Sequence, residues 1–423
     1  MSRPFYETCR PRSECSLCRS GLLDLCARLP NTPLANDFRD SNSDPNDREL
    51  FPLAIVMCRE CYHVQLSHLV DPGRLFGAYL YETGTSPQTL THLQKEANAI
   101  VTKSRKMIEE LSVLEIGSND GSLLKIFVQM GVKSDHVIGI EPSSTMTGKA
   151  IKDGIPTLQA FFGPGIERAL KRDWDVVVAN NVLAHVPSVR DVLETAAKFV
   201  APTGFLVMEV GNAADIMKGA FDVIYHEHMS YHSLAPLRRA LEDVGLPMFD
   251  VEKSEGEVGR GSLRVWAGRG RSPSKRMLDE LDKEESLALD DPRLWRKRLE
   301  RRKGSLVGAT ANAITGYFTR WKRTKEKPVI AGFGAPAKLT TLTYACDVPD
   351  VVAIGEDSSW KIGKLTPGRR ISIVSRKDML AMRPDSIIVY AWNFADQIAK
   401  ELKIGGYRGE IYVPLPESRV ISP

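Results

Sequence analysis

The chain has 423 residues, of which 43% are hydrophobic and 26% are charged, a length that allows two or three domains, each burying its own core. Such a composition excludes a disordered protein, and no apolar run approaches the roughly 20 residues that a membrane-spanning helix needs. The formal net charge of +4 is small for this length, so it neither implies nor excludes a nucleic-acid partner. Residues 1–6 lack the apolar stretch of a signal peptide, and we therefore expect a cytoplasmic protein.

Two Cys-x-x-Cys pairs lie near the start of the chain, with 39 residues between them. Six of the seven cysteines fall within the first 61 residues, which indicates a local site rather than a disulfide framework. Two such pairs can supply four thiolates to one zinc ion, and a site without an open position stabilises the fold rather than catalysing. A redox role is the alternative, disfavoured because neither pair opens a helix in a strand-helix-strand pattern, and Cys9 is an alternative ligand. The predicted ligands of this structural zinc are Cys15, Cys18, Cys58 and Cys61.

The middle of the chain alternates apolar strands with helical patterns. A strand at 112–116 is followed by a small-residue turn at 117–121 and a helical stretch. A second strand at 136–140 ends at Glu141, where an acidic side chain can bind the two hydroxyls of a ribose. Further strands are predicted at 174–179 and 204–210. This alternation predicts an α/β fold with an open parallel sheet that binds ligands at the carboxyl ends of its strands.

The small-residue turn at 117–121, which follows the strand at 112–116, indicates a class of cofactor. Asn119 stands where the second glycine of G-x-G-x-x-G would be, so a nicotinamide cofactor is disfavoured. The run Glu-x-Gly-x-Asn-x-Gly at 115–121 resembles the S-adenosylmethionine site of class I methyltransferases, and a generic glycine-rich turn is the alternative. Polar residues within 180–186 follow the predicted strand at 174–179 and lie at the same edge of the sheet, which favours an S-adenosylmethionine site. The candidate cofactor-binding residues are Glu115, Gly117, Asn119, Gly121, Glu141, Pro142, Asn180, Asn181 and His185.

Residues 225–231, Tyr-His-Glu-His-Met-Ser-Tyr, follow the last predicted parallel strand. Two imidazoles, a carboxylate and two phenols in so short a segment indicate acid/base chemistry. One alternative is a loop whose histidines hydrogen-bond backbone carbonyls. A metal site formed by His226 and His228 is another, disfavoured because no third ligand is evident nearby.

The last third of the chain begins a second strand-helix pattern. A helical region is expected over about 292–325, and its basic run at 296–303 is typical of a solvated helix face, with attraction of a diphosphate or RNA as alternatives. A strand then enters a glycine-rich turn and a helix near Lys338, a combination that suits a diphosphate because backbone N–H groups point out of a helix N-terminus. Later strands are predicted at 351–355, 386–390 and 410–413.

Taken in order, the motifs of this chain resemble those of the nucleotide-sugar C-methyltransferases of deoxysugar biosynthesis. The motifs are the two cysteine pairs, the second within Cys-x-x-Cys-Tyr-His-Val-Gln-Leu, then 114–121, 181–186, 225–231 and 261–265. The resemblance implies a small zinc-binding domain at 1–75, a class I, Rossmann-like S-adenosylmethionine-binding domain at 76–270 and a Rossmann-like α/β substrate-binding domain at 271–423. It also implies methylation of C3 of a 4-keto sugar carried on a nucleoside diphosphate.

The same resemblance implies roles for individual residues. His228 is the base that removes a proton from carbon, Glu227 orients it or binds a sugar hydroxyl, and Tyr225 hydrogen-bonds the enolate. The implied substrate contacts are Tyr79, Tyr81, Arg264 and Lys338. For either tyrosine, core packing is the alternative, and Arg264 could equally be an exposed sheet arginine.

The chain departs from the family pattern at Glu82, Gly84, Gly259, Arg260 and Leu339. None of these positions lies in the glycine turn or in the Tyr-His-Glu-His run, so the resemblance predicts that methyl transfer is kept while the substrate differs. Two other functions stay open: an O- or N-methyltransferase for another natural product, and a zinc-stabilised RNA-binding or scaffold protein without catalysis. For the leading hypothesis we expect no nucleic-acid partner, no membrane, and a monomer or homodimer.

Overall fold

The computed structural model describes residues 8–44, 49–76, 83–85, 87–170, 173–254, 261–301, 328–346 and 350–422. These residues form two compact units, each assembled from segments that are separated along the chain. Unit 1 comprises Met1–Asp24, Val56–Ala214 and Met229–Asp290, and unit 2 comprises Leu25–Ile55, Asp215–His228 and Asp291–Pro423. The predicted domain boundaries at 75 and 270 stay predictions.

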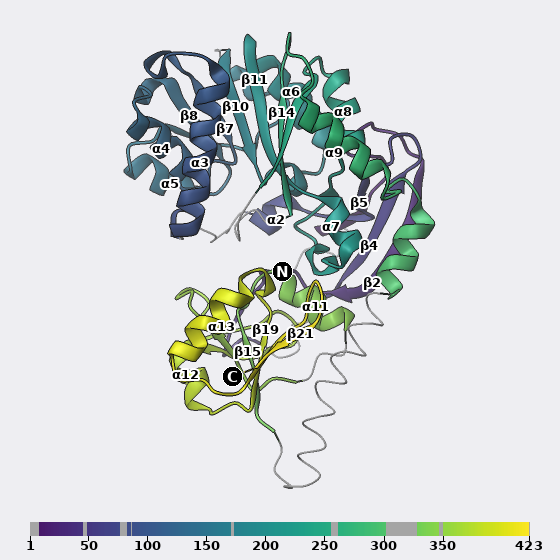
Figure 1. Cartoon of the computed structure of the whole chain (residues 1–423), viewed down its shortest axis with the longest axis vertical. Helices are drawn as coiled ribbons and strands as arrows, with labels where there is room; N and C mark the ends of the chain where they lie inside the picture. Colours follow the sequence, from purple (N-terminus) through teal and green to yellow (C-terminus); the bar gives the residue numbers. More distant parts are fainter. Residues whose placement is uncertain are drawn as a thin grey trace. The chain divides into compact units, whose positions relative to one another are not determined.

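Unit 1 contains a seven-stranded sheet in the order β13-β14-β11-β10-β7-β8-β9 (Figure 1). The five strands from β11 to β9 are parallel, β14 pairs with β11 in the antiparallel direction, and β13 pairs antiparallel with β14 at the edge. The predicted open parallel sheet is therefore confirmed, with an antiparallel extension. The strands are β7(Val113–Ile116), β8(Val137–Glu141), β9(Thr157–Gln159), β10(Trp174–Asn180), β11(Val200–Gly211), β13(Met248–Lys253) and β14(Ser262–Ala267).

Helices cover both faces of this sheet, which explains why β10 is apolar from Val176 to Ala179. In β10, Val176 and Val178 pack into the cluster formed with α3 and α4, while Val177 and Ala179 pack into the cluster formed with α6 and α8. Successive side chains of a strand point to opposite faces, so a strand buried on both faces needs a continuous apolar run. Figure 1 shows these helices beside the sheet. The helices of this unit are α2(Pro72–Phe76), α3(Pro87–Ser104), α4(Ser122–Met130), α5(Ser144–Lys152), α6(Val189–Phe199), α8(Leu234–Asp243) and α9(Lys275–Glu285).

The N-terminal part of the chain forms two small antiparallel arrangements. Strand β1(Cys9–Pro11) pairs with β6(His68–Val70), and a four-stranded sheet has the order β12-β5-β4-β2. The strands of that sheet are β2(Leu23–Thr32), β4(Phe51–Cys58), β5(Val64–Leu66) and β12(Ser230–Tyr231). Strand β12 forms the end of the predicted proton-handling segment at 225–231, and its residues Ser230 and Tyr231 pair with Gln65 and Val64 of β5.

Unit 2 contains a six-stranded sheet in the order β18-β16-β15-β19-β20-β21, parallel except for β21. The chain leaves β15 toward β16 on one side and returns to β19 on the other, so the sheet has a topological switch point between β15 and β19. The strands are β15(Ile330–Phe333), β16(Ile354–Glu356), β18(Ile373–Ser375), β19(Ser386–Val389), β20(Glu410–Val413) and β21(Arg419–Ile421). The helices are α11(Lys338–Ala345), α12(Arg376–Ala381) and α13(Ala395–Ile404).

Several predicted features lie partly outside the described residues. The helix expected over 292–325 is present from 292 to 301, and its remainder, with the end of the basic run, falls outside the described ranges. The same holds for Tyr79, Tyr81, Glu82, Gly259 and Arg260. Within the described part of the chain, no helix has both the length and the apolarity needed to cross a membrane.

Candidate functional site

The two Cys-x-x-Cys pairs come together in unit 1, and the sulfur atoms of all four cysteines lie within 4.8 Å of one another. Cys15 Sγ is 3.6 Å from Cys61 Sγ, and Cys18 Sγ is 3.5 Å from Cys58 Sγ. Four sulfurs at about 2.3 Å from a tetrahedral zinc ion are about 3.8 Å apart, so these residues fit zinc. Across the described ranges, this group is the one set of His, Cys, Asp and Glu side chains close enough together to hold a metal.

Backbone donors support the sulfurs of this cluster. Leu17 N–H donates to Cys15 Sγ and Glu60 N–H donates to Cys58 Sγ, each at 3.4 Å. Such bonds favour the thiolate form because they place donors against its negative charge. The alternative ligand Cys9 lies outside the cluster. With four thiolates and no fifth group, the zinc site is closed, as a structural site requires.

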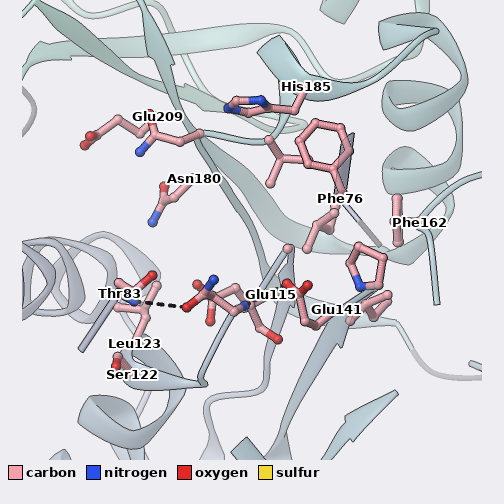
Figure 2. Close-up of a pocket in the computed structure, with 18 of the residues that line it drawn as sticks. Phe76, Thr83, Glu115, Ser122, Leu123, Glu141, Phe162, Asn180, His185 and Glu209 are labelled. Carbon is pink, nitrogen blue, oxygen red and sulfur yellow. Dashed lines mark hydrogen bonds between the residues drawn. The ribbon is translucent and has the colours of Figure 1, made fainter. Parts of the chain in front are cut away.

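A second site in unit 1 is a cavity of about 340 Å³ at the carboxyl edge of the seven-stranded sheet (Figure 2). Its walls come from the turn after β7, from the ends of β8, β10 and β11, and from α3. This volume is in the range of sites that enclose a small organic cofactor. The predicted cofactor residues that line it are Glu115, Gly117, Asn119, Glu141, Pro142, Asn180, Asn181 and His185.

The turn after β7 needs glycine for a steric reason. Gly117 has φ +67°, and a Cβ atom there would lie 2.6 Å from Val182 Cγ2. Asn119 also adopts a left-handed backbone, with φ +51°. These conformations carry the backbone close past the pocket floor, where it can approach a ligand.

Glu141 is held in place at the end of β8. Its Oε2 accepts the Asn119 N–H at 3.0 Å and its Oε1 accepts the Ser143 N–H at 2.8 Å. Burial raises the pKa of Glu141, and the two backbone donors oppose that rise. Each oxygen keeps a second lone pair, so the carboxylate can accept two hydroxyls of a ribose.

Three side chains of the pocket have polar atoms that meet no hydrogen-bond partner within the described part of the chain: Glu115 Oε2, Ser118 Oγ and Asn180 Oδ1. Burial, followed by the nearby carboxylates, raises the pKa of Glu115 well above its usual value. Buried polar groups in proteins are normally hydrogen-bonded, so these atoms fit a pocket that receives a polar ligand. The cavity therefore fits S-adenosylmethionine in size, in backbone access and in polar groups.

Two predicted residues have surroundings that the sequence did not indicate. Gly121 is outside the pocket lining, and its missing Cβ makes room for Ala150 and Ile155, which lie 3.2 Å from that position. Arg264 is buried among carboxylates: it donates to Glu209 Oε2 at 3.0 Å and approaches Glu96 Oε1 at 3.6 Å. These carboxylates compete with a phosphate for the guanidinium, and the phosphate contact predicted for Arg264 stays a prediction.

Sequence reasoning missed the two ionisable residues His92 and Glu209 of the pocket. His92 on α3 lies 2.8 Å from Glu209 Oε2, and Glu209 comes near the end of β11. A glutamate inside the apolar run of a predicted strand was a signal that could have found Glu209, because a buried carboxylate needs partners. His92 gave no such signal, since it lies on the half-buried side of a long helix.

Of the predicted proton-handling segment at 225–231, residues 225–228 belong to unit 2 and residues 229–231 belong to unit 1. His228 Nδ1 lies 2.9 Å from the Val223 carbonyl oxygen, which can only accept, so Nδ1 carries the proton. In the neutral ring, Nε2 then has the lone pair, and it lies 2.8 Å from the Tyr225 hydroxyl, which donates to it. The two rings stack with centroids 4.1 Å apart. This arrangement is that of a neutral imidazole ready to accept a proton at Nε2.

The other two side chains of this segment differ in their surroundings. Asn36 Nδ2 lies 2.8 Å from both carboxylate oxygens of Glu227, and burial raises the pKa of Glu227 to about 7 while the Asn36 bond opposes that rise. His226 Nε2–H donates to the Pro52 carbonyl at 3.2 Å, as in a loop whose histidines satisfy backbone carbonyls. Glu227 is therefore close to changing charge near neutral pH, whereas His226 is tied to backbone.

Lys338 lies at the start of α11, next to the switch point of the sheet in unit 2. Its Nζ is 3.9 Å from the centre of the Trp392 ring and donates to Asn393 Oδ1 at 2.8 Å. Burial lowers the pKa of Lys338, and Asp222, which accepts the Trp392 Nε1–H at 2.6 Å, opposes that shift. The proton-handling segment is joined to the same helix, because Thr341 Oγ1 donates to the Ile224 carbonyl at 2.6 Å.

Family models match three successive parts of the chain. A family described as "Putative zinc binding domain" matches residues 15–76, a methyltransferase domain matches 89–250, and a C-methyltransferase C-terminal domain matches 257–416. The order of these matches follows the order of the cysteine cluster, the cofactor cavity and the second α/β sheet along the chain.

One individual relative matches nearly the full length of the chain, and two others match shorter parts of it. C-methyltransferase NovU of Streptomyces niveus is 31% identical over 429 aligned positions, which cover 98% of this chain and 98% of that protein. Ubiquinone biosynthesis O-methyltransferase of Rhodopseudomonas palustris strain TIE-1 is 32% identical over 113 positions, which cover 26% of this chain and 44% of that protein. A solved magnesium protoporphyrin IX methyltransferase from Synechocystis PCC 6803 is 18% identical, with a TM-score of 0.33, over 43% of this chain and 79% of that one.

Proposed function

The chain belongs to the C-methyltransferase family of NovU, and on that premise we propose that this S-adenosylmethionine-dependent enzyme methylates the carbon next to the ketone of a nucleotide-linked 4-keto sugar, at C3. The observation that carries this proposal is the hydrogen-bonding of His228. A carbon beside a ketone becomes nucleophilic only after it loses a proton, so the enzyme needs a base whose lone pair is exposed to the substrate carbon. An oxygen or nitrogen acceptor already has a nucleophilic lone pair and needs no base that forms an enolate.

His228 is the proposed base. The Val223 carbonyl fixes the proton on Nδ1, which leaves the Nε2 lone pair to take the proton from C3. Tyr225 holds Nε2 through its hydroxyl before the substrate is bound, and it then donates that hydroxyl to the enolate oxygen as negative charge develops there. Glu227, oriented by Asn36, binds a hydroxyl of the sugar.

The proposed methyl-donor site is the cavity of unit 1. S-Adenosylmethionine, when bound, supplies an electrophilic methyl group at a cationic sulfur. Glu115, Glu141 and Glu209 line the cavity, and their carboxyl groups suit a ligand with a positive sulfonium and a positive ammonium. Glu141 binds the ribose hydroxyls, while the turn at Gly117 admits the rest of the ligand to the backbone.

The proposed site for the nucleoside diphosphate is the switch point of unit 2. Gly334, with φ +80°, turns the chain from β15 toward α11, and Lys338 brings a positive charge to the N-terminus of that helix. Trp392 offers a flat face beside Lys338. Thr341 of α11 is hydrogen-bonded to Ile224, the residue before Tyr225. This bond supports a substrate whose phosphates and reacting carbon both bind to unit 2.

The decisive experiment measures exchange of the C3 proton. A 4-keto nucleotide sugar is incubated in deuterium oxide with the enzyme and S-adenosylhomocysteine, and the loss of the C3–H signal is followed by NMR. We expect the wild-type enzyme to catalyse exchange, and His228→Asn to slow both exchange and methylation by at least about 100-fold, the usual contribution of a general base. His136→Gln, a substitution outside both sites, serves as the control and should leave the rates unchanged.

The product identifies the acceptor. Mass spectrometry of incubations with a panel of 4-keto nucleotide sugars should reveal a product heavier by one methylene group, with the new methyl on carbon. A His228→Asn enzyme that methylates its substrate at the wild-type rate would show that the acceptor is an oxygen or nitrogen atom, and it would refute the proposed reaction.

A further inference from the structure

Asp222 is a buried carboxylate of unit 2 close to the proposed base in the chain, and the proposed reaction assigns it no step. It is 0% exposed and lies in the short turn η6(Phe221–Val223), just before Tyr225. Its Oδ2 accepts the Trp392 Nε1–H at 2.6 Å. A carboxylate taken out of water is costly unless its partners offset the loss of hydration, so the contacts of Asp222 decide its role.

The turn that contains Asp222 also fixes the tautomer of the proposed base. The carbonyl of Val223, the next residue, accepts the His228 Nδ1–H at 2.9 Å. A neutral imidazole has one proton, so this bond keeps the proton on Nδ1 and the lone pair on Nε2. A movement of the turn that withdraws the Val223 carbonyl would release that choice, and the ring could then place its proton on Nε2, where it cannot accept another from carbon.

Two hydrogen bonds fasten this turn and the residue after it to the switch point of the sheet in unit 2. Thr341 Oγ1 on α11 donates to the Ile224 carbonyl at 2.6 Å. Trp392 belongs to η7(Trp392–Phe394), which follows β19, and it donates to Asp222. The turn is therefore held both by the helix that follows β15 and by the segment that follows β19, the two strands that border the switch point.

Asp222 also acts on the proposed diphosphate site. Lys338 Nζ lies 3.9 Å from the centre of the same Trp392 ring and donates to Asn393 Oδ1 at 2.8 Å. Burial lowers the pKa of Lys338, and the negative charge of Asp222 opposes that shift. Burial likewise raises the pKa of Asp222, and Lys338 and the Trp392 Nε1–H oppose that rise. Each of the two charges therefore favours the ionised form of the other.

We propose that Asp222 is a positioning residue of this enzyme. Through its bond to Trp392 it holds the turn that presents the Val223 carbonyl to the base, and its charge supports Lys338 at the diphosphate site. One carboxylate thus sets both the orientation of the base and the anchoring of the substrate. This inference rests on the proposed function, since it takes His228 as the base and the diphosphate as the ligand of unit 2.

Two substitutions of Asp222 separate the two effects. Asp222→Asn keeps an oxygen that can accept the Trp392 Nε1–H but removes the charge, whereas Asp222→Ala removes both. We expect Asp222→Ala to slow C3-proton exchange and kcat by about tenfold or more, because the turn is released and the tautomer of His228 is no longer fixed. Asp222→Asn should keep kcat within about threefold but raise the KM for the nucleotide sugar by about tenfold, because Lys338 loses the charge that favours its ionised form. Asp222→Ala should share this rise in KM.

The tautomer of His228 gives a readout that does not depend on the substrate. In protein with isotope-labelled histidine, long-range proton–nitrogen NMR spectra distinguish an Nδ1–H ring from an Nε2–H ring, and His228→Asn identifies the signals. We expect the Nδ1–H form in the wild type and in Asp222→Asn, and a mixture of both forms in Asp222→Ala. Trp392→Phe keeps an aromatic ring beside Lys338 but lacks the N–H donor, so it should give the same mixture and the same loss of exchange as Asp222→Ala.

Asp215→Ala is the matched control. Asp215 lies on α7(Ala213–Lys218), begins the same segment of unit 2 as Asp222, and forms an ion pair with Lys218 at 3.6 Å. We expect the wild-type tautomer, kcat and KM in this variant. Thermal unfolding of every variant checks that the protein is folded.

Three outcomes would overturn the inference: a wild-type tautomer and kcat in Asp222→Ala, an equal loss of kcat in Asp222→Asn and Asp222→Ala, or an unchanged KM in Asp222→Asn. If Asp222→Ala does not fold, Trp392→Phe takes its place, and a wild-type tautomer in that variant overturns the inference equally. Failure of the wild-type enzyme to exchange the C3 proton would instead refute the proposed reaction. The tautomer spectra would then still decide whether Asp222 positions the ring of His228.

Discussion

At the scale of single residues, the protein adjusts protonation by the choice of hydrogen-bond partner. His228 is fixed in one tautomer because Val223 offers a carbonyl, which accepts and cannot donate. Glu227 is buried, which favours its neutral form, but Asn36 donates toward both of its oxygens and favours the charged form. The balance places the pKa of Glu227 at about 7, so its charge is sensitive to the loss of one neighbour.

Replacing Asn36 with alanine should therefore raise the pKa of Glu227 further, because the group that stabilises the carboxylate is removed while burial remains. If the ionised form is required, the acidic limb of the pH profile of kcat/KM moves to higher pH, and the variant approaches wild-type activity only in alkaline buffer. The measurement is kcat/KM over a range of pH values on both sides of 7.

Asn98→Ala, at an exposed position of α3, is the control and should keep the wild-type profile. A pH profile of Asn36→Ala that coincides with the wild type at every pH would mean that ionisation of Glu227 does not limit the reaction.

At the scale of elements, the strand-turn-helix formed by β7, its turn and α4 requires glycine at two positions, because a side chain there would clash with its neighbours or strain the backbone. Gly117 has both a positive φ and a neighbour, Val182, in the space where a side chain would go. Gly121 has a positive φ as well, and it lets α4 begin close to Ala150 of α5. One glycine thus opens the pocket, while the other allows two helices to pack.

Gly117→Ala should weaken S-adenosylmethionine binding by about tenfold or more and lower the free energy of unfolding by over about 1 kcal/mol, because the new methyl group collides with Val182 and the residue disfavours this backbone conformation. Calorimetric titration and thermal unfolding measure the two effects.

Gly148→Ala is the matched control. Gly148 lies inside α5 with nothing within 4 Å of the added atom, so alanine should leave binding unchanged and stabilise the helix by up to about 1 kcal/mol. Equal behaviour of the two variants would remove the steric argument for Gly117.

At the scale of the whole molecule, the two halves of the proposed reaction belong to different compact units. The cavity that fits the methyl donor is formed within unit 1, while His228, Tyr225 and Lys338 belong to unit 2. Ligand binding to the two units should therefore respond separately to substitution. The zinc cluster lies in unit 1 and has a structural role.

Lys338→Met should raise the KM for the nucleotide sugar by about tenfold or more, since the charge that we propose to bind the diphosphate is lost, and should leave the Kd for S-adenosylmethionine unchanged. Lys377→Met, at an exposed position of α12, controls for loss of one positive charge. An unchanged KM in Lys338→Met would remove this lysine from the substrate site.

Loss of zinc should destabilise the fold without changing the chemistry of the base. Cys18→Ser is expected to bind less than one zinc ion per chain by elemental analysis and to lower Tm by at least about 5 °C, because a structural metal contributes its binding energy to folding. Cys9→Ser, outside the cluster, should retain both the metal and the Tm. A zinc-free Cys18→Ser protein with wild-type Tm would argue against a structural role.

The sequence by itself determined the parts of this protein that depend on short segments. The cysteine pairs, the turn at Gly117 and the acid Glu141 each follow from local geometry, and apolar strands alternating with helices required a parallel sheet with covered faces. The class of reaction, C-methylation, was inferred from sequence similarity along the full length of the chain.

Only the tertiary structure decided which charges meet. Asn36 reaches Glu227 across 191 positions, His92 reaches Glu209 across 117, and Arg264 reaches the same Glu209 across 55. The physical reason is that a buried charge takes whichever partner the packed chain brings within about 4 Å, and no local pattern of residues encodes that distance.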